Sequence, residues 1–157
     1  MLEWEANERH LINAPADADL TITELIDRFW RHAQTYYRHP DGSNTGELTA
    51  LTYSLRALRY LHGATLAKEF GPSALKGVRE LFVTGYEHPK YGPQKPLCRN
   101  QVNARTKRIR RVFRWAVENE LVPPSTLHGL QAVAPLKRGR TTAKESAPVK
   151  PVARGGS

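Results

Sequence analysis

Apolar residues recur at steps of three and four over much of the chain, and this spacing predicts amphipathic helices. The first helix is expected to begin near Thr21, because Thr21 and Glu24 have the spacing of a capping box. Residues 39–46 have the sequence HPDGSNTG, which is typical of a loop and ends the helix. The apolar stripe between these limits consists of Leu25, Ile26, Phe29, Trp30, Ala33 and Tyr37.

Two further helices are expected after this loop. Thr45 is the expected N-cap of the second helix, and Gly63 is its expected C-cap. The third helix is expected to begin at Pro72, since proline suits the first turn of a helix, and to end at Gly85. The predicted apolar positions are Leu48, Leu51, Leu55, Leu58 and Leu61 in the second helix and Ala74, Leu75, Val78, Leu81 and Phe82 in the third. Residues 86–97 contain three prolines, a density at which we expect no regular secondary structure.

The fourth helix, over about residues 100–120, has the clearest pattern in the chain. Its buried stripe is predicted to consist of Val102, Ile109, Val112, Phe113, Ala116 and Val117. Pro123 and Pro124 end this helix, and Ser125 is the expected N-cap of a short fifth helix. The inward-facing positions of the fifth helix are Leu127, Leu130 and Val133. The sequence therefore predicts an all-α fold, a small bundle of four to five helices with no strand.

The helical pattern is confined to the middle of the chain, which sets the expected domain boundaries. Residues 1–19 are mixed and polar and are expected to form a disordered N-terminal arm. The helical domain is expected to span residues 20–134. Residues 135–157 have no apolar period and are expected to form a disordered linker or tail.

Segments typical of secretion or membrane insertion are missing from the sequence. The first twenty residues carry five acidic residues and no apolar core, so they do not have the pattern of a signal peptide. No run approaches the roughly 18 apolar residues that a membrane-spanning helix needs. The single cysteine, Cys98, excludes a disulfide framework within the chain. We therefore expect a cytoplasmic protein that has no membrane partner.

The net charge of +9 is concentrated in one short stretch. Residues 1–98 carry 11 basic and 12 acidic side chains, whereas residues 99–140 carry 10 basic and 2 acidic ones. A localised basic face indicates a polyanionic partner more strongly than a diffuse positive charge does.

Motifs that would carry catalysis, metal binding or cofactor binding are absent. The six histidines form no HExxH motif or i,i+4 pair, and one cysteine cannot build a Cys-rich zinc site. No glycine-rich phosphate-binding motif occurs. We therefore expect no metal, no cofactor and no small-molecule substrate.

The fourth helix combines polar and basic residues in a way that suits a nucleic-acid groove. Seven Lys or Arg residues lie between Arg99 and Arg114, and no acidic residue follows until Glu118. Solvated helices usually alternate charges, because like charges at i,i+4 repel each other. Cations release counterions from phosphates, and Asn and Gln side chains can read base edges. The pattern favours contact with DNA or RNA over a plain solvated face.

The residues from the start of the fourth helix through the fifth resemble a known family. The run LCRNQVNARTKRIRRVFRWAVENELVPPSTLHGL, residues 97–130, resembles the end of the core-binding domain of tyrosine recombinases, the phage-type integrases. The first helix, LTITELIDRFWRHAQTYYR, and the Leu-rich second helix are also similar to that domain. The matching positions near the C-terminal end are Asn100, Val102, Asn103, Arg105, Phe113, Ala116, Val117, Glu120, Leu121, Val122 and Pro123. Residues 88–96 depart from the shorter turn of the family.

The resemblance implies a SAM-like core-binding domain that clamps double-stranded DNA without cutting it. In the family a separate catalytic domain supplies an Arg, a Lys, a His-x-x-Arg and a Tyr nucleophile, and no His-x-x-Arg occurs here. We therefore expect a non-enzymatic chain that lacks the catalytic domain and takes part in DNA integration or recombination. A full-length recombinase is a further candidate partner. The candidate DNA-binding residues are Asn100, Asn103, Arg105, Lys107, Arg108, Arg111 and Arg114 on the fourth helix and Arg56 and Arg59 on the second.

Two other functions fit the same sequence features. One is a helical protein-interaction module whose basic helix docks an acidic partner. The other is a small helix-turn-helix regulator, although the long loop before the fourth helix argues against the short turn that such a motif needs. Steep salt dependence on duplex DNA separates DNA binding from binding to a protein.

Overall fold

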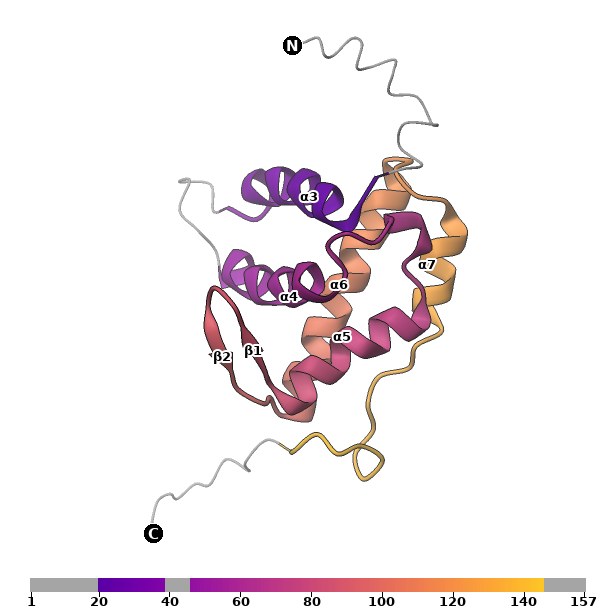
Figure 1. The fold of residues 1–157 in the computed structure, drawn as a ribbon. Helices are drawn as coiled ribbons and strands as arrows, with labels where there is room; N and C mark the ends of the chain where they lie inside the picture. The colour runs from indigo at the N-terminus through magenta and orange to yellow at the C-terminus, as the bar shows by residue number, and fades with distance from the viewer. Residues whose placement is uncertain (1–19, 39–45, 146–157) are drawn as a thin grey trace.

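The computed structural model describes residues 20–38 and 46–145 (Figure 1). The described elements are α3 Ile22–Tyr36, α4 Gly46–His62, the 3-10 turn η1 Ala67–Glu69, α5 Pro72–Thr84, β1 Tyr86–His88, β2 Gly92–Gln94, α6 Arg99–Glu118 and α7 Pro124–Gln131. The predicted arm over residues 1–19, the predicted cap at Thr45 and the tail beyond residue 145 lie outside the described residues. The fold is an all-α bundle with one small hairpin, and it agrees with the predicted class.

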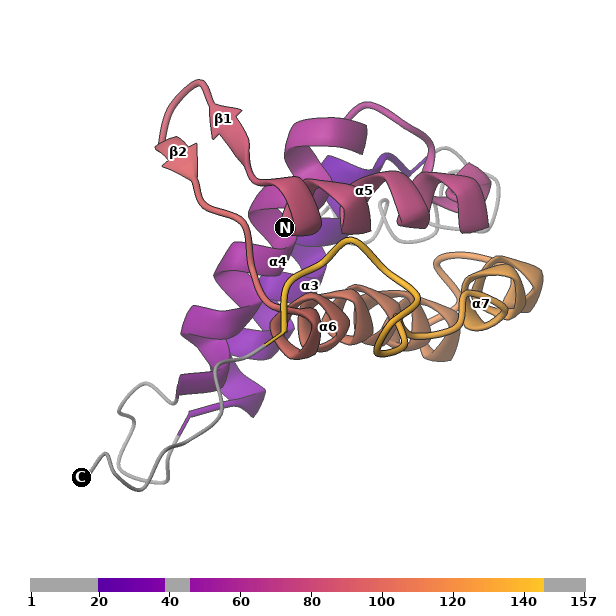
Figure 2. The same ribbon diagram turned by 90° about the horizontal axis from the view of Figure 1, so that it is seen from below.

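The helix α6 is the centre of the bundle. It packs against α3, α4, α5 and α7, and Figure 2 shows it running beneath α5 with α7 beside one end. Its inward face consists of Val102, Thr106, Ile109, Val112, Phe113 and Ala116, all buried. The predicted stripe is confirmed at five of these positions, whereas Val117 is only partly buried. The packing of α6 therefore leaves its opposite face free to carry charged side chains.

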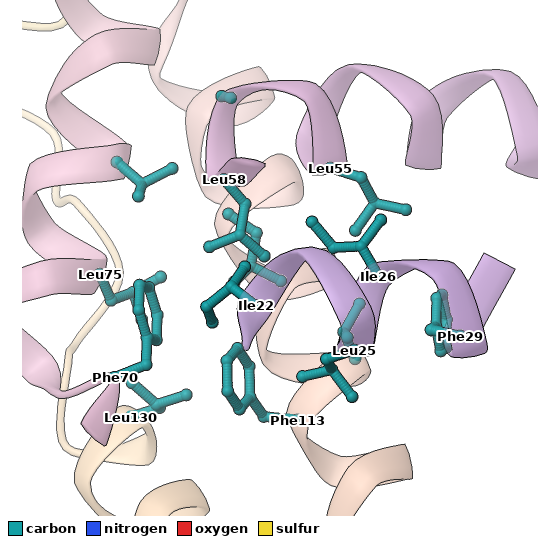
Figure 3. Close-up of a cluster of buried hydrophobic side chains, with 14 of the residues drawn as sticks. Ile22, Leu25, Ile26, Phe29, Leu55, Leu58, Phe70, Leu75, Phe113 and Leu130 are labelled. Atoms are coloured by element: carbon teal, nitrogen blue, oxygen red, sulfur yellow. The ribbon is translucent and has the colours of Figure 1, made fainter. Parts of the chain in front are cut away.

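The core is built around the four phenylalanines of the chain. Phe29, Phe70, Phe82 and Phe113 are all at most 1% exposed. Phe70 stacks on Phe113 with ring centroids 5.1 Å apart and an interplanar angle of 9°. Figure 3 shows this pair among the apolar side chains of α3, α4, α5 and α7. Burying such large rings supplies much of the apolar driving force for a domain of this size.

The start of α3 and the start of α5 agree with their sequence signals. The Thr21 hydroxyl accepts a hydrogen bond from the Glu24 backbone at 3.2 Å, and the Glu24 carboxylate accepts one from the Thr21 backbone at 2.9 Å. Pro72 occupies the first turn of α5, and Gly85 ends it. Two details of the prediction are wrong. Ser125 lies within the first turn of α7 because Pro124 begins that helix. Leu61, near the end of α4, is 41% exposed and is not part of the buried face of that helix.

The expectation of no strand between α5 and α6 is also wrong, because β1 and β2 form an antiparallel hairpin. Tyr86 pairs with Gln94, and His88 pairs with Gly92. Pro93 is tolerated in β2 although it has no backbone N–H to donate. Each strand of a two-stranded sheet is an edge strand, so the N–H groups on its outer side pair with no other strand. Gly85 has φ +79°, and a Cβ there would lie 2.6 Å from the Gln94 carbonyl oxygen. Glycine at this position therefore allows the chain to turn from α5 into the hairpin.

Residues 135–145, which the sequence assigns to a linker, return to the first turn of α6 (Figures 1 and 2). The Arg99 backbone N–H donates to the Lys144 carbonyl at 2.6 Å, and the Arg99 guanidinium pairs with Glu145 at 2.9 Å. Ala143 is 6% exposed and belongs to the core. We name residues 135–145 the C-terminal strap. Its packing extends the folded unit beyond the predicted boundary at residue 134.

Candidate nucleic-acid interface

Four cationic side chains lie on one face of α6. Lys107, Arg110, Arg111 and Arg114 have the spacing i, i+3, i+4 and i+7, which places them in one row along the helix. We call these four residues the cationic ridge. They line a recess of about 210 Å³ between α6 and α7, together with Leu127 and Gln131. The ridge is the strongest concentration of positive charge on α6 that shares a single surface.

The acid nearest to the ridge comes from the first turn of α4. The Glu47 carboxylate accepts hydrogen bonds from the Arg108 Nε at 3.0 Å and from the Arg111 guanidinium. Burial raises the pKa of Glu47, but the hydrogen bonds and charges of the two arginines outweigh it and lower that pKa overall. From the sequence, the like charges of α6 are expected to require an external polyanion to offset their repulsion. Arg111 departs from this expectation, because Glu47 of α4 supplies it with a negative partner within the protein.

The other three ridge residues have no such partner. In residues 20–38 and 46–145, no carboxylate oxygen lies within 4.0 Å of Lys107, Arg110 or Arg114. Lys107 and Arg114 are exposed. Their charges therefore remain available to an anion approaching this side of α6.

Arg110 is the least satisfied member of the ridge. Its Nη1 atom is covered by protein and has no hydrogen-bond partner within the described chain. Burial lowers the pKa of Arg110, and the nearby charge of Arg79 lowers it further. A covered cation with an unused donor is costly unless an anion compensates it. Arg110 is not among the DNA-binding residues predicted from the sequence, although its spacing from Lys107 and Arg114 places it on the same face of the helix.

Two other predicted residues, Arg105 and Arg56, lie on the α4 side of α6, away from the recess. The Arg105 guanidinium sits over the Tyr53 ring at 4.9 Å and over the Phe82 ring at 5.5 Å. Burial is the main reason that the pKa of Arg105 is lowered. Arg56 also sits over Tyr53, at 5.1 Å. The predicted DNA-binding residues are thus divided between two surfaces.

The two predicted asparagines at the start of α6 have different surroundings. Asn100 is exposed. The Asn103 amide donates to the Leu136 carbonyl at 3.1 Å and accepts from the Leu136 backbone N–H at 2.8 Å. Both amide atoms that a bidentate contact with a base requires are therefore engaged by the C-terminal strap. Of the two, only Asn100 keeps its whole amide for an external partner.

The Asn103 contacts predict a measurable role in stability. Asn103→Ala removes two hydrogen bonds, which leaves the Leu136 N–H without its partner and the Leu136 carbonyl with only the Arg99 guanidinium, at 3.5 Å. We expect a loss of about 1–3 kcal/mol in the free energy of unfolding, measured by urea denaturation. Asn100→Ala removes the same side chain from an exposed position and should change stability by less than about 0.5 kcal/mol. Equal losses in the two variants would show that the strap contact does not stabilise the domain.

Together, these features define a small all-α domain whose central helix carries a cationic ridge. Comparison with protein-family models, with curated proteins and with solved structures finds no match. None of the helices in residues 20–38 and 46–145 has the length and apolar character to cross a bilayer. Within the same ranges, no group of three His, Cys, Asp or Glu side chains is arranged to hold a metal ion.

Proposed function

We propose that this chain binds duplex DNA through α6, as a core-binding domain of an integrase-like tyrosine recombinase, and does not cleave it. The observation that carries this proposal is the cationic ridge, in which Lys107, Arg110 and Arg114 have no carboxylate partner among the described residues. A helix of this kind fits the major groove, which is about 12 Å wide, and its cations neutralise phosphates. The proposal places the protein in the cytoplasm and makes a full-length recombinase a further partner.

The ridge borders the recess between α6 and α7, and its first and last residues, Lys107 and Arg114, are exposed. Its first and last members are seven residues apart, which corresponds to about 10 Å along the helix axis. Phosphate contacts of this kind orient a helix on the duplex but carry no sequence information by themselves. Asn100, about two turns before Lys107, is an exposed side chain of α6 that can contact a base edge.

The proposal predicts a steep salt dependence of binding to duplex DNA. The four ridge residues and Arg108 amount to about five phosphate contacts, so the log-log slope of affinity against salt should be near −4 to −5. Fluorescence anisotropy with a labelled duplex at about 50–200 mM KCl measures this slope. Absence of binding at the lowest salt would contradict autonomous DNA binding.

An acidic protein partner is the second candidate function. The observation in its favour is that a carboxylate, that of Glu47, already binds Arg108 and Arg111. If the ridge binds an acidic protein and not DNA, the chain should have no affinity for duplex DNA. Its affinity for the acidic partner should then depend less steeply on salt concentration than DNA binding would. The duplex titration therefore separates the two candidates.

A further inference from the structure

A second cationic surface lies in a groove on the other side of the domain. The helix α4 lies between α3 and the β1–β2 hairpin (Figure 1), so it forms the floor of this groove and the other two elements form its walls. The groove has a volume of about 610 Å³, within the range of roughly 300–1,000 Å³ typical of ligand sites. It does not include any residue of the cationic ridge.

Aromatic rings occupy both walls and the floor of the groove. Trp30 of α3 forms one wall, Tyr60 of α4 lies on the floor, and Tyr91 of the hairpin forms the other wall. Tyr60 is 43% exposed and Tyr91 is 50% exposed. Exposed rings of this size are costly in water, and they offer flat faces to a ligand that can stack on them.

The hairpin wall is held in place by a continuous series of ring contacts. The Tyr60 ring lies 5.1 Å from Tyr86 and 5.4 Å from His88, and the His88 ring lies 4.9 Å from Tyr91. The His88 Nδ1 accepts hydrogen bonds from the backbone N–H groups of Lys90 and Tyr91, at 3.0 and 3.2 Å. These contacts order the tip of the hairpin over α4. The groove is therefore formed before a ligand arrives, which lowers the entropic cost of binding.

Three cations surround these rings. The Arg56 guanidinium lies 3.8 Å from the centre of the Tyr91 ring, and Arg59 and Lys90 also line the groove. No carboxylate oxygen of the described residues lies within 4.0 Å of these three side chains, and Asp27 is the one acidic residue of the lining. The balance of charge therefore favours an anionic occupant.

Aromatic rings and cations in one groove are the combination that binds single-stranded nucleic acid. Bases stack on rings without regard to sequence, while cations follow the phosphate backbone. An acidic peptide would use the cations but would leave the rings without a partner of matching shape. Asp27 and Thr52 add hydrogen-bonding groups to the groove, and the amino and imino groups of a base can donate to such oxygens.

We propose that the groove between α3, α4 and the hairpin binds an unpaired segment of a nucleic-acid strand, with bases stacked on Tyr60 and Tyr91 and phosphates on Arg56, Arg59 and Lys90. This site is separate from the ridge that carries the proposed binding of duplex DNA. The two sites together would allow the domain to hold a duplex and an adjoining unpaired strand.

The test measures anisotropy of a labelled oligothymidylate of about 12 nucleotides, within the usual size of such sites. Tyr91→Ala should weaken binding by about 5- to 100-fold, as expected for the loss of one stacked base. Lys90→Gln, at the exposed tip, should make the log-log salt slope shallower by about 0.7. Lys76→Gln removes the same charge from α5, outside both surfaces, and should have no effect. Thermal unfolding of each variant checks that the fold is retained.

The result depends on which site each variant affects. The proposal is supported if the groove variants lose oligothymidylate binding while their affinity for duplex DNA equals that of the wild-type protein, including the case in which the wild-type protein binds no duplex. It is overturned if Tyr91→Ala and Lys90→Gln bind the oligonucleotide as well as the wild type does. It is also overturned if Lys107→Gln with Arg114→Gln abolishes that binding while the groove variants retain it, because the strand would then lie on the ridge. If the protein binds free thymidine monophosphate but does not bind the oligonucleotide, the groove is not a strand-binding site.

Discussion

Replacing Lys107, Arg110 and Arg114 with glutamine is expected to lower the affinity for duplex DNA by about 100- to 1,000-fold at about 0.1 M salt. Each cation that neutralises a phosphate contributes about 0.9 to the log-log salt slope. Three such contacts correspond to about 2.7 in that slope, and to a similar number of decades in affinity at this salt concentration. The effect is large because these three ridge residues lack a carboxylate partner among the described residues. Anisotropy titrations over a salt series measure both quantities.

A charge-matched variant separates the ridge from the net charge of the protein. Arg31, Lys68 and Lys76 are exposed and lie outside both the ridge and the groove. Replacing all three with glutamine lowers the net charge equally, and we expect little change in the salt slope. Equal losses in the two triple variants would mean that binding depends on overall charge, and the ridge would then not be the interface. A double variant at the exposed Lys107 and Arg114 avoids the packing around Arg110 and should remove about 1.8 from the slope.

The sequence predicts the elements of this fold well where apolar residues repeat with the period of a helix. The stripes of α3, α4, α5 and α6 and the capping box at Thr21 all follow from local spacing. Phe70 could not be found in this way, because it lies in the connection between η1 and α5 and is buried by residues distant in the sequence, including Phe113. The hairpin was missed for a similar reason. A two-stranded ribbon tolerates prolines that a larger sheet would exclude, so proline density alone is a poor guide there.

The site is less predictable than the fold, because its electrostatics depend on contacts between distant segments. Glu47 lies more than sixty positions from Arg111 in the chain, and no local pattern links them. Asn103 has the residue type and position expected of a base-reading side chain, but Leu136 of the strap binds its amide. Arg110 is the opposite case, since the spacing of the ridge residues was present in the sequence. Helical spacing therefore predicts which cations share a face, but not which of them are already neutralised.

The contacts of Glu47 predict that its carboxylate stabilises the fold. Glu47→Gln keeps the shape of the side chain but leaves Arg108 and Arg111 beside each other without a negative partner. We expect a loss of about 1–3 kcal/mol in the free energy of unfolding at pH 7, measured by urea denaturation. The folded-state pKa of Glu47 is lowered from 4.5, so the wild-type protein should keep this contribution above about pH 4.5 and lose it as the pH falls through the folded-state pKa. The stability difference between wild type and Glu47→Gln should therefore shrink in acid.

The same substitution is expected to strengthen DNA binding. In the free protein the Glu47 carboxylate competes with phosphates for Arg108 and Arg111, and both guanidiniums are partly exposed. Its removal should raise the affinity for duplex DNA by roughly tenfold at about 0.1 M salt, because phosphates would no longer have to displace a carboxylate from these two arginines. Glu80→Gln removes an equal charge from the exposed side of α5 and should change neither stability nor affinity. A loss of both stability and affinity in Glu47→Gln would instead mean that Glu47 holds the two arginines in their binding positions. Lower stability with higher affinity is the result expected if the fold and the DNA compete for the same two cations.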